Sequence, residues 1–438
     1  MPSLYDKLMK RGYDMRRLCS GLGKYVLTFG ISVVLALALL ILAAFAPQGR
    51  ILDNLWESVD LLHMEGTYPH VADYEAASRL DNFTDILMLL ESVATNDQYL
   101  GSVLTNPVYV YEEAGVDLPT LLKNYLNGMP HDSVGFYVRY WMGFRVVLRI
   151  ALTFLSYFQI RRYLAVIFFT LFAAVMCDIA KRVDSKLAFF FAVSIILLRP
   201  QVIVNSMQYC TCFFIMFAAM LLVPVVRKRP QWEGVFFMEV GLLTMYFDFY
   251  TAPLITFGFP MVYLYALTLE EGKNLSGKRM GKNALLWMSG YVLMWVAKLV
   301  LTSILTEVNA VANGWNALLG RLGVSKTEGL EEFYSLELAM RRLGETLFSD
   351  GEGKVIFLGV LAAVILVVAI CVVRKKGALQ DVRKLWPLLI LAAMPFAWFL
   401  ATIQPLAMHH FFQYRMIALT YWAAGAFVYF LLWGKKKV

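Results

Sequence analysis

The residues best suited to chemistry are two aspartates in a short acidic stretch, Leu80-Asp81-Asn82-Phe83-Thr84-Asp85. Asp81 and Asp85 are four residues apart, so their carboxylates would share one face of a helix that continues through residues 86–90. Two carboxylates on one face can share a proton, bind a cation or accept a proton from a hydroxyl group. A structural interpretation also fits, in which Asp81 or Thr84 is the N-cap of the helix and Asp85 interacts with its dipole.

The composition is that of a membrane protein. Of the 438 residues, 59% are hydrophobic and only 16% are charged, whereas soluble proteins contain about 25% charged residues. The formal charge of +8 does not indicate a nucleic-acid partner, because the basic residues form short clusters between apolar runs, as in cytoplasmic loops. The five cysteines lie in or beside apolar runs or in the basic N-terminus, so no disulfide framework is predicted.

The pattern predicts an all-α polytopic protein with about ten transmembrane helices in a single membrane domain, residues 1–438. The predicted spans are 25–46, 159–180, 187–203, 209–226, 233–250, 252–269, 283–305, 354–373, 385–403 and 416–433. The number depends on residues 144–158, which contain Arg145 and Arg149. If this segment is an interfacial helix, every basic cluster falls on the cytoplasmic side of the plasma membrane, together with both termini.

Two long polar segments separate the spans. The first, residues 47–144, contains the acidic stretch and an excess of acidic residues. We expect helices in it near 72–95 and 117–127. The second segment, 306–353, contains a predicted helix near 333–347. Together they are expected to form an extracytoplasmic cap.

Polar residues inside or beside spans are costly, so each is a candidate for function. Asp248 lies at an outer turn before Pro253, and a solvated turn aspartate is the alternative. Lys298 lies inside a span, where it would face an anionic ligand or extend toward the interface.

Further candidates gather where the last span begins and before the second. Arg415 suits phosphate oxygens, because guanidinium groups bind them in a fixed geometry. His410, Arg139 and Arg145 complete the predicted substrate-binding set. The alternatives are an interfacial belt for the histidine and contacts with lipid headgroups for the arginines. Zinc is not expected, because His409 and His410 are adjacent and cannot share one helix face.

No phosphate-binding loop, dinucleotide-binding motif or catalytic triad is evident, and the cytoplasmic segments are too short for a nucleotide-binding domain. Chemistry would therefore occur at the outer face. Carboxylates in a polar loop, with cations at the ends of the spans, suit a lipid-linked phosphate. The cations would hold the phosphate while a carboxylate deprotonates an acceptor hydroxyl.

In this layout the chain resembles the GT-C superfamily of integral-membrane glycosyltransferases. The likeness consists of a cytoplasmic N-terminus, one span, a large first outer loop with acidic residues, interfacial helices, about ten spans in all and a second outer loop. The resemblance implies transfer of a sugar from a polyprenyl-phosphate donor to a cell-envelope glycan or lipid acceptor, within the membrane lipids. It also implies that an aspartate of the first loop acts as base or binds a metal, which leaves a divalent cation open as a cofactor.

By position, Asp81 and Asp85 match the catalytic aspartates of that superfamily. The better-known acidic pairs of the superfamily follow the first span more closely, which keeps Asp53, Asp60 and Asp73 as alternatives. A single displacement would invert the configuration at the anomeric carbon.

Two other functions fit parts of the pattern. A secondary transporter or lipid flippase would use Asp248 and Lys298 as an intramembrane relay. A non-catalytic partner in a cell-envelope complex is the third. The long acidic loop and the lack of an internal repeat favour the transferase.

Overall fold

The structure is a computed structural model. It describes residues 4–72, 75–95, 101–110, 117–129, 133–324, 333–348 and 378–434, with Gly359, Ala362 and Ala369 as isolated residues. Almost all ordered structure in these ranges is helical. The one sheet they contain pairs β1 (Pro107–Val110) with β2 (Ser133–Phe136) in antiparallel register. The predicted all-α class is confirmed.

Among the described residues, seven helices are long and apolar enough to cross a membrane. They are Gly21–Ala44 of α1 (Leu4–Ala44), α7 (Tyr157–Arg182), α10 (Met207–Arg227), α12 (Pro253–Glu270), α13 (Gly277–Leu305), Arg383–Ala401 of α17 (Ala378–Ala401), and the run Ile403–Trp433. That run consists of α18 (Ile403–Gln413), the 3-10 helix η3 (Tyr414–Ile417) and α19 (Ala418–Trp433). The chain is therefore a multi-pass membrane protein.

Two predicted spans correspond to shorter helices. α8 (Ser185–Ile196) has 12 residues and α11 (Glu233–Phe247) has 15. A helix of 15 residues is about 22 Å long, less than the roughly 30 Å of a hydrocarbon core. Apart from three isolated residues, the predicted span 354–373 lies outside the described residues. The predicted number of ten spans stays a prediction.

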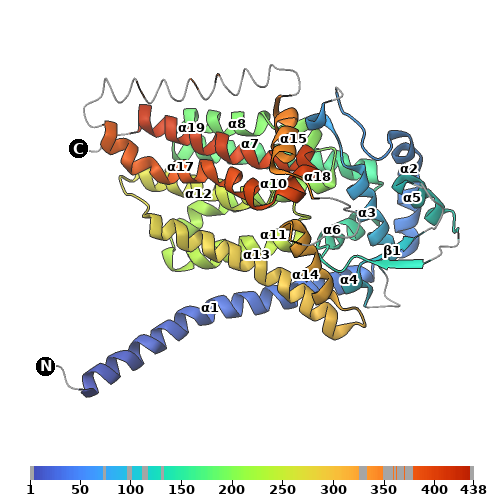
Figure 1. Ribbon diagram of the computed structural model, residues 1–438, viewed down its shortest axis with the longest axis horizontal. Helices are drawn as coiled ribbons and strands as arrows, with labels where there is room; N and C mark the ends of the chain where they lie inside the picture. The colour runs from blue at the N-terminus through green and yellow to red at the C-terminus, as the bar shows by residue number, and fades with distance from the viewer. Residues whose placement is uncertain are drawn as a thin grey trace.

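The long helices run side by side along the longest axis of the molecule, and α1 follows one edge of the bundle (Figure 1). The first loop forms the cap at the end opposite the two termini. The helices of the cap are α2 (Gln48–Glu65), α3 (Asn82–Ala94), α4 (Ser102–Thr105), α5 (Leu118–Leu126) and α6 (Phe144–Leu152), with the 3-10 helix η1 (Ala76–Ser78). The helices predicted near 72–95 and 117–127 are confirmed by α3 and α5.

Two helices of the second loop, α14 (Ala310–Arg321) and α15 (Leu336–Phe348), pack where the cap meets the bundle. The helix predicted near 333–347 is confirmed by α15. The short helices α9 (Pro200–Ile203) and η2 (Pro230–Trp232) join neighbouring long helices.

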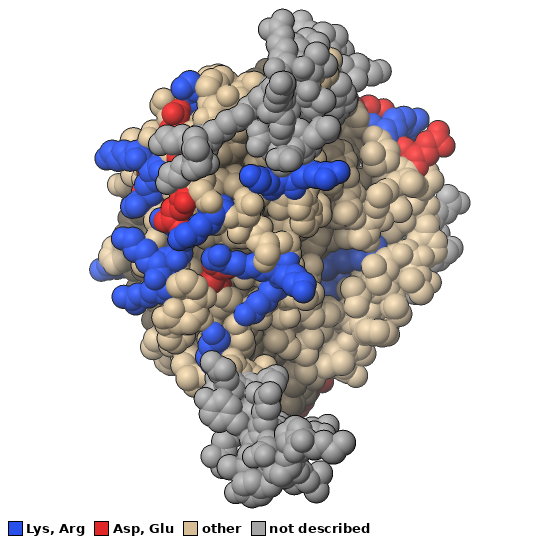
Figure 2. Space-filling model, turned by 90° about the vertical axis from the view of Figure 1, so that its left-hand side faces the viewer, with Lys and Arg blue, Asp and Glu red and all other residues tan. Residues whose placement is uncertain are grey.

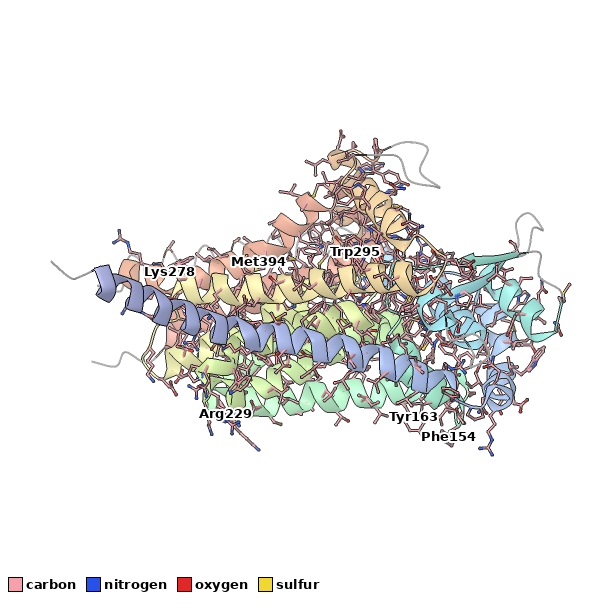
Figure 3. The ribbon with its side chains drawn as sticks, turned by 90° about the horizontal axis from the view of Figure 1, so that it is seen from below. Phe154, Tyr163, Arg229, Lys278, Trp295 and Met394 are labelled. Carbon is pink, nitrogen blue, oxygen red and sulfur yellow. The ribbon has the colours of Figure 1, made fainter. Side chains whose placement is uncertain are left out.

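Basic side chains gather at the end that carries the termini, as Figure 2 shows. Figure 3 places Arg229 and Lys278 near this end and Phe154 and Tyr163 beside the cap. The positive-inside rule would assign the basic end to the cytoplasm.

The backbones of α11 and α13 lie close together at two glycines. A Cβ atom added to Gly241 of α11 would overlap the carbonyl oxygen of Trp287, and one added to Gly290 of α13 would overlap that of Met238. Small residues permit such close packing between membrane helices. These two glycines therefore fix the spacing of the pair.

We expect Gly290→Ala to destabilise the protein by about 1–3 kcal/mol, the usual effect of overpacking. Gly281 of the same helix is the control, because a Cβ there would have no neighbour within 4 Å. Gly281→Ala should leave the unfolding free energy unchanged or raise it by up to about 1 kcal/mol, because Ala has a higher helix propensity than Gly. Thermal unfolding in detergent measures both, and equal melting temperatures would contradict the close contact.

Candidate functional site

The junction between cap and bundle is built on α6, which turns its arginines inward. Arg145 and Arg149 are fully buried, whereas Val147 and Ile150 are 63% and 52% exposed. An apolar outer face suits a helix that lies against lipid. The arginines must therefore find partners in the interior.

Arg149 binds the carbonyl ends of two helices. Its Nε donates to the Ala43 carbonyl at 2.8 Å, its Nη2 to the Ala44 carbonyl at 3.2 Å and its Nη1 to the Thr95 carbonyl at 2.6 Å. The last carbonyls of a helix have no partner within the helix. Arg149 therefore satisfies the ends of α1 and α3 together.

Arg145 joins the parts of the cap to one another. It donates to Thr95 Oγ1 and Asn106 Oδ1, both at 2.6 Å, and to the Val103 carbonyl at 2.8 Å. Burial lowers the pKa of Arg145 to about 10. This predicted substrate-binding residue contacts protein groups in the interior.

Lys298 of α13 lies in the same interior region. Its Nζ donates to the Leu104 carbonyl at 2.5 Å and lies 5.8 Å from the ring centroid of Trp141. Glu91 of α3 is nearby and fully buried, and its two carboxyl oxygens have no hydrogen-bond partner among the described residues. Burial raises the pKa of Glu91 to about 8, although Arg145 and Lys298 oppose the shift. Glu91 was not among the residues predicted from the sequence.

Asp85 is fully buried and accepts hydrogen bonds from four groups. Tyr157 Oη donates at 2.6 Å, the Met207 N–H at 2.9 Å, and Ser206 Oγ and the Gln208 N–H at 3.1 Å. The two N–H groups belong to the first turn of α10, which needs such acceptors. Asp85 thus caps the start of α10, although the two are far apart in the sequence. Burial raises the pKa of Asp85.

Arg161 of α7 extends this network to the start of α3. Its Nε donates to Tyr157 Oη at 2.8 Å and its Nη2 to Asn82 Oδ1 at 2.6 Å. Its Nη1 forms an ion pair with Glu65 at 2.9 Å. These contacts fix the position of Asn82 and therefore of the preceding residue, Asp81.

Asp81 is the N-cap of α3. Its Oδ1 accepts from the Thr84 N–H at 3.1 Å and its Oδ2 from Thr84 Oγ1 at 2.8 Å. The N-cap interpretation of Asp81 is confirmed. The side chain is 2% exposed. Burial raises the pKa of Asp81 to about 6, and the hydrogen bonds from Thr84 oppose the shift.

Asp81 lines a cavity of about 460 Å³ between the cap, α14 and α18, which we call the polar cavity. Its charged lining residues, within the described part of the chain, are Asp81, Arg139 and Arg321. Much of the remaining wall is aromatic, and Gln208, Gln404 and His409 add polar atoms. The structure therefore brings one carboxylate and two guanidinium groups to a single cavity.

Both arginines of the cavity lie over aromatic rings. Arg139 Cζ is 4.9 Å from the ring centroid of Tyr137. Arg321 Cζ is 5.4 Å from that of Tyr140 and 5.2 Å from that of Tyr250, and Arg321 also donates to Tyr140 Oη. Aromatic faces hold a guanidinium in place and leave its edge free for oxygen ligands. Arg321 was not among the residues predicted from the sequence.

Three predicted residues lie around this cavity. Asp248 is buried, and Oδ2 accepts from the Thr251 N–H at 3.0 Å. It therefore shapes the turn that brings Phe249 and Tyr250 into the cavity wall. His410 makes a 2.6 Å hydrogen bond with Thr346 Oγ1, whereas its neighbour His409 lines the cavity.

Arg415, the third, is 1% exposed and lies 3.9 Å from the ring centroid of Tyr209. Its Nη1 donates to the Phe411 carbonyl at 3.3 Å, and Nε and Nη2 have no hydrogen-bond partner in the described part of the chain. Phe412 and Gln208, which neighbour these residues in the chain, line the cavity. Arg415 therefore lies behind the cavity wall.

A second hollow adjoins the polar cavity. This apolar groove has a volume of about 430 Å³ and is lined by side chains of α3, α6, α7, α10 and α11. Glu239, which accepts from Ser32 Oγ at 2.8 Å, is the one charged residue among its described lining. Met207 lines the groove while the next residue, Gln208, lines the cavity.

The apolar groove is open toward the lipid side. Val147, Leu222 and Leu243, from three helices of its wall, are 63%, 51% and 38% exposed. Phe144 of the groove stacks on Phe249 of the cavity with ring centroids 5.3 Å apart. The two hollows therefore meet at this pair of rings, one from each wall.

The alternative aspartates lie elsewhere. Asp60 forms an exposed ion pair with Lys123 at 2.9 Å, and Asp53 is exposed on α2. Asp73 lies outside the described residues. The described residues contain no group of three or more His, Cys, Asp or Glu side chains that could hold a metal ion.

No family model, curated protein or solved structure matches this chain. The geometry of the two hollows is therefore the guide to function.

The two aspartates should respond differently to the same substitution. Asp85→Asn replaces an acceptor by an NH₂ group and leaves buried donors unpaired, so we expect a loss of about 1–3 kcal/mol in unfolding free energy. Asp81→Asn should change stability by only a few tenths of a kcal/mol, because Asn caps helices about as well as Asp. Thermal unfolding of the purified variants measures both. Equal destabilisation by the two substitutions would contradict these roles.

Proposed function

We propose that this protein is a membrane glycosyltransferase of GT-C-like organisation, with about ten spans. It moves a sugar from a polyprenyl-phosphate donor to a hydroxyl group of a cell-envelope glycan or lipid. The observation that carries the proposal is the polar cavity, which is lined by a buried carboxylate and two arginines and lies beside an apolar groove.

The two hollows match the two parts of such a donor. An isoprenoid chain is apolar and would lie in the apolar groove, whose side is open to lipid. The phosphate would then reach the polar cavity past Phe144 and Phe249. Arg139 and Arg321 supply the guanidinium groups that suit its oxygens.

The cavity supports a single displacement. Asp81 accepts the proton of the acceptor hydroxyl while the oxygen of that hydroxyl forms a bond to the anomeric carbon. The bond from that carbon to the phosphate oxygen breaks, and the lipid phosphate leaves with the electron pair. Arg139 and Arg321 stabilise the charge that develops on this leaving group. Attack opposite to the leaving group inverts the configuration at the anomeric carbon.

The base in this proposal is Asp81 alone. Asp85 accepts hydrogen bonds from four donors. Its role in the reaction is to hold α10 and the start of α3 in position. The cap would face the extracytoplasmic side and both termini the cytoplasm, which the basic end of the bundle supports (Figure 2).

We expect Asp81→Asn to lower single-turnover sugar transfer by about 10²–10⁴, the usual contribution of a general base. Donor binding should persist, because the arginines and the groove are unchanged. Arg321→Gln should weaken donor binding, whereas Arg341→Gln should not, since Arg341 is a 68% exposed arginine of α15. The measurement is transfer of labelled sugar from polyprenyl-phosphate donors to cell-envelope extracts.

Near-normal turnover of Asp81→Asn would remove Asp81 from the mechanism. A wild-type protein that transfers no sugar from any donor but moves the lipid across a proteoliposome membrane would instead establish the flippase alternative.

The transfer rate should also depend on pH through Asp81. The base must be ionised, so kcat/KM should fall tenfold per pH unit below about 6, the raised pKa of Asp81, and level off above it. Thr84→Val removes one hydrogen bond that favours the carboxylate, so the midpoint should move to higher pH. A midpoint near the ordinary carboxyl value of 3.8, unmoved by Thr84→Val, would contradict this assignment.

A further inference from the structure

A third hollow lies on the outermost layer of the cap, between α2 and α5. We call it the outer groove. It has a volume of about 590 Å³, and its side chains include Leu52, Asp53 and Trp56 of α2 together with Tyr125 and Met129. None of these residues lines the polar cavity or the apolar groove.

The outer groove does not face the bundle. The buried face of α2 packs inward, where Asn54 donates to the Leu152 carbonyl at 2.8 Å and Ser58 Oγ accepts from the Phe158 N–H at 3.4 Å. α2 and α5 form the end of the molecule farthest from the termini (Figure 1). A ligand of this groove would therefore come from the aqueous phase beyond the cap.

The residue types of the groove suit a sugar. Trp56 is 39% exposed, and Tyr125 is half-buried beside it. A pyranose ring offers an apolar face that stacks on aromatic rings, and its hydroxyl groups donate to carboxylates such as Asp53. The groove volume lies within the usual range of about 300–1,000 Å³ for small-ligand sites.

The charges around the groove restrict the ligand further. Arg50, Asp53 and Glu57 are exposed on α2, and Asp60 is the exposed partner of Lys123. These five charges sum to −1, so the carboxylates that Arg50 and Lys123 do not balance would repel an anionic polymer at close range. They would also make burial against lipid costly. An uncharged saccharide meets neither obstacle.

α2 runs from the groove toward the start of α3, where Asp81 lines the polar cavity. Asp53 precedes Glu65 by 12 residues in α2, which corresponds to about 18 Å at the helical rise. Glu65 accepts from Asn82, the neighbour of Asp81, at 3.0 Å. An extended chain of a few sugars could thus contact both places.

We propose that the outer groove binds a neutral polysaccharide chain of the cell envelope. If the proposed transfer function holds, this chain is the acceptor or its extension. The binding itself needs neither donor nor catalysis.

The test is electrophoresis of the full-length protein in detergent through native gels that contain neutral polysaccharide purified from the envelope of the source cells. We expect the polysaccharide to retard the wild-type protein. Trp56→Ala should raise the apparent dissociation constant about tenfold, and Asp53→Asn should raise it severalfold. Thermal unfolding of both variants checks that they remain folded, which matters for Trp56→Ala because that side chain is only 39% exposed.

Matched controls separate this site from general effects. Trp232→Ala removes a tryptophan that is 50% exposed near the basic end, and Glu57→Gln removes a carboxylate of α2 outside the groove lining. Neither should alter retardation. Asp81→Asn should bind the polysaccharide normally even where it fails to transfer sugar, so the two proposals can fail separately.

Several results would overturn the proposal. They are a wild-type protein that the neutral polysaccharide does not retard, equal retardation of Trp56→Ala, or retardation by anionic polysaccharide only. Retardation that protease treatment of the polysaccharide abolishes would identify a protein ligand and reject a saccharide.

Discussion

One buried arginine that binds backbone carbonyl groups, Arg149 of α6, holds the cap to the membrane bundle, and a second, Arg145, holds the parts of the cap together. Arg149 joins the carbonyl ends of α1 and α3, and Arg145 joins Thr95 to the segment at Asn106. A buried cation that loses its partners costs several kcal/mol. The cap therefore cannot tilt away from α1 without taking the Arg149 guanidinium away from the Ala43 and Ala44 carbonyls. A cavity between cap and bundle can keep its shape because these contacts fix one of its walls.

Asp85 adds the second constraint, because it ties α3 to the first turn of α10. Arg161 then ties the start of α3 to α2 through Glu65. Asp81 precedes Asn82 in the chain, so these contacts set its position at the cavity. Burial by the same packing makes Asp81 a stronger base than an exposed aspartate. The N-cap and the proposed base are one carboxylate, and its structural role gives it a fixed orientation.

The sequence predicted the membrane class and the helices of the cap, and it left an N-cap at Asp81 as the structural alternative to catalysis, because each follows from local patterns. It also marked Arg145 and Lys298 as candidates for binding an anionic substrate. It did not identify their carbonyl partners within the protein, since carbonyl groups at helix ends attract cations as phosphate oxygens do. Arg321 was missed because its aromatic neighbours Tyr140 and Tyr250 come from distant segments. The pairing exists only after α14 packs against the cap.

The contact between Asp85 and α10 also determines the order in which parts of the protein fold during synthesis. The aspartate and the Met207 N–H are 122 residues apart in the chain. When the ribosome has made α3, the helix that receives this carboxylate has not yet been translated. Until α10 enters the membrane, Asp85 must remain hydrated and α3 cannot reach its final place. Maturation of the cap therefore waits for membrane insertion, and a truncated chain would present an unfinished cap to proteases.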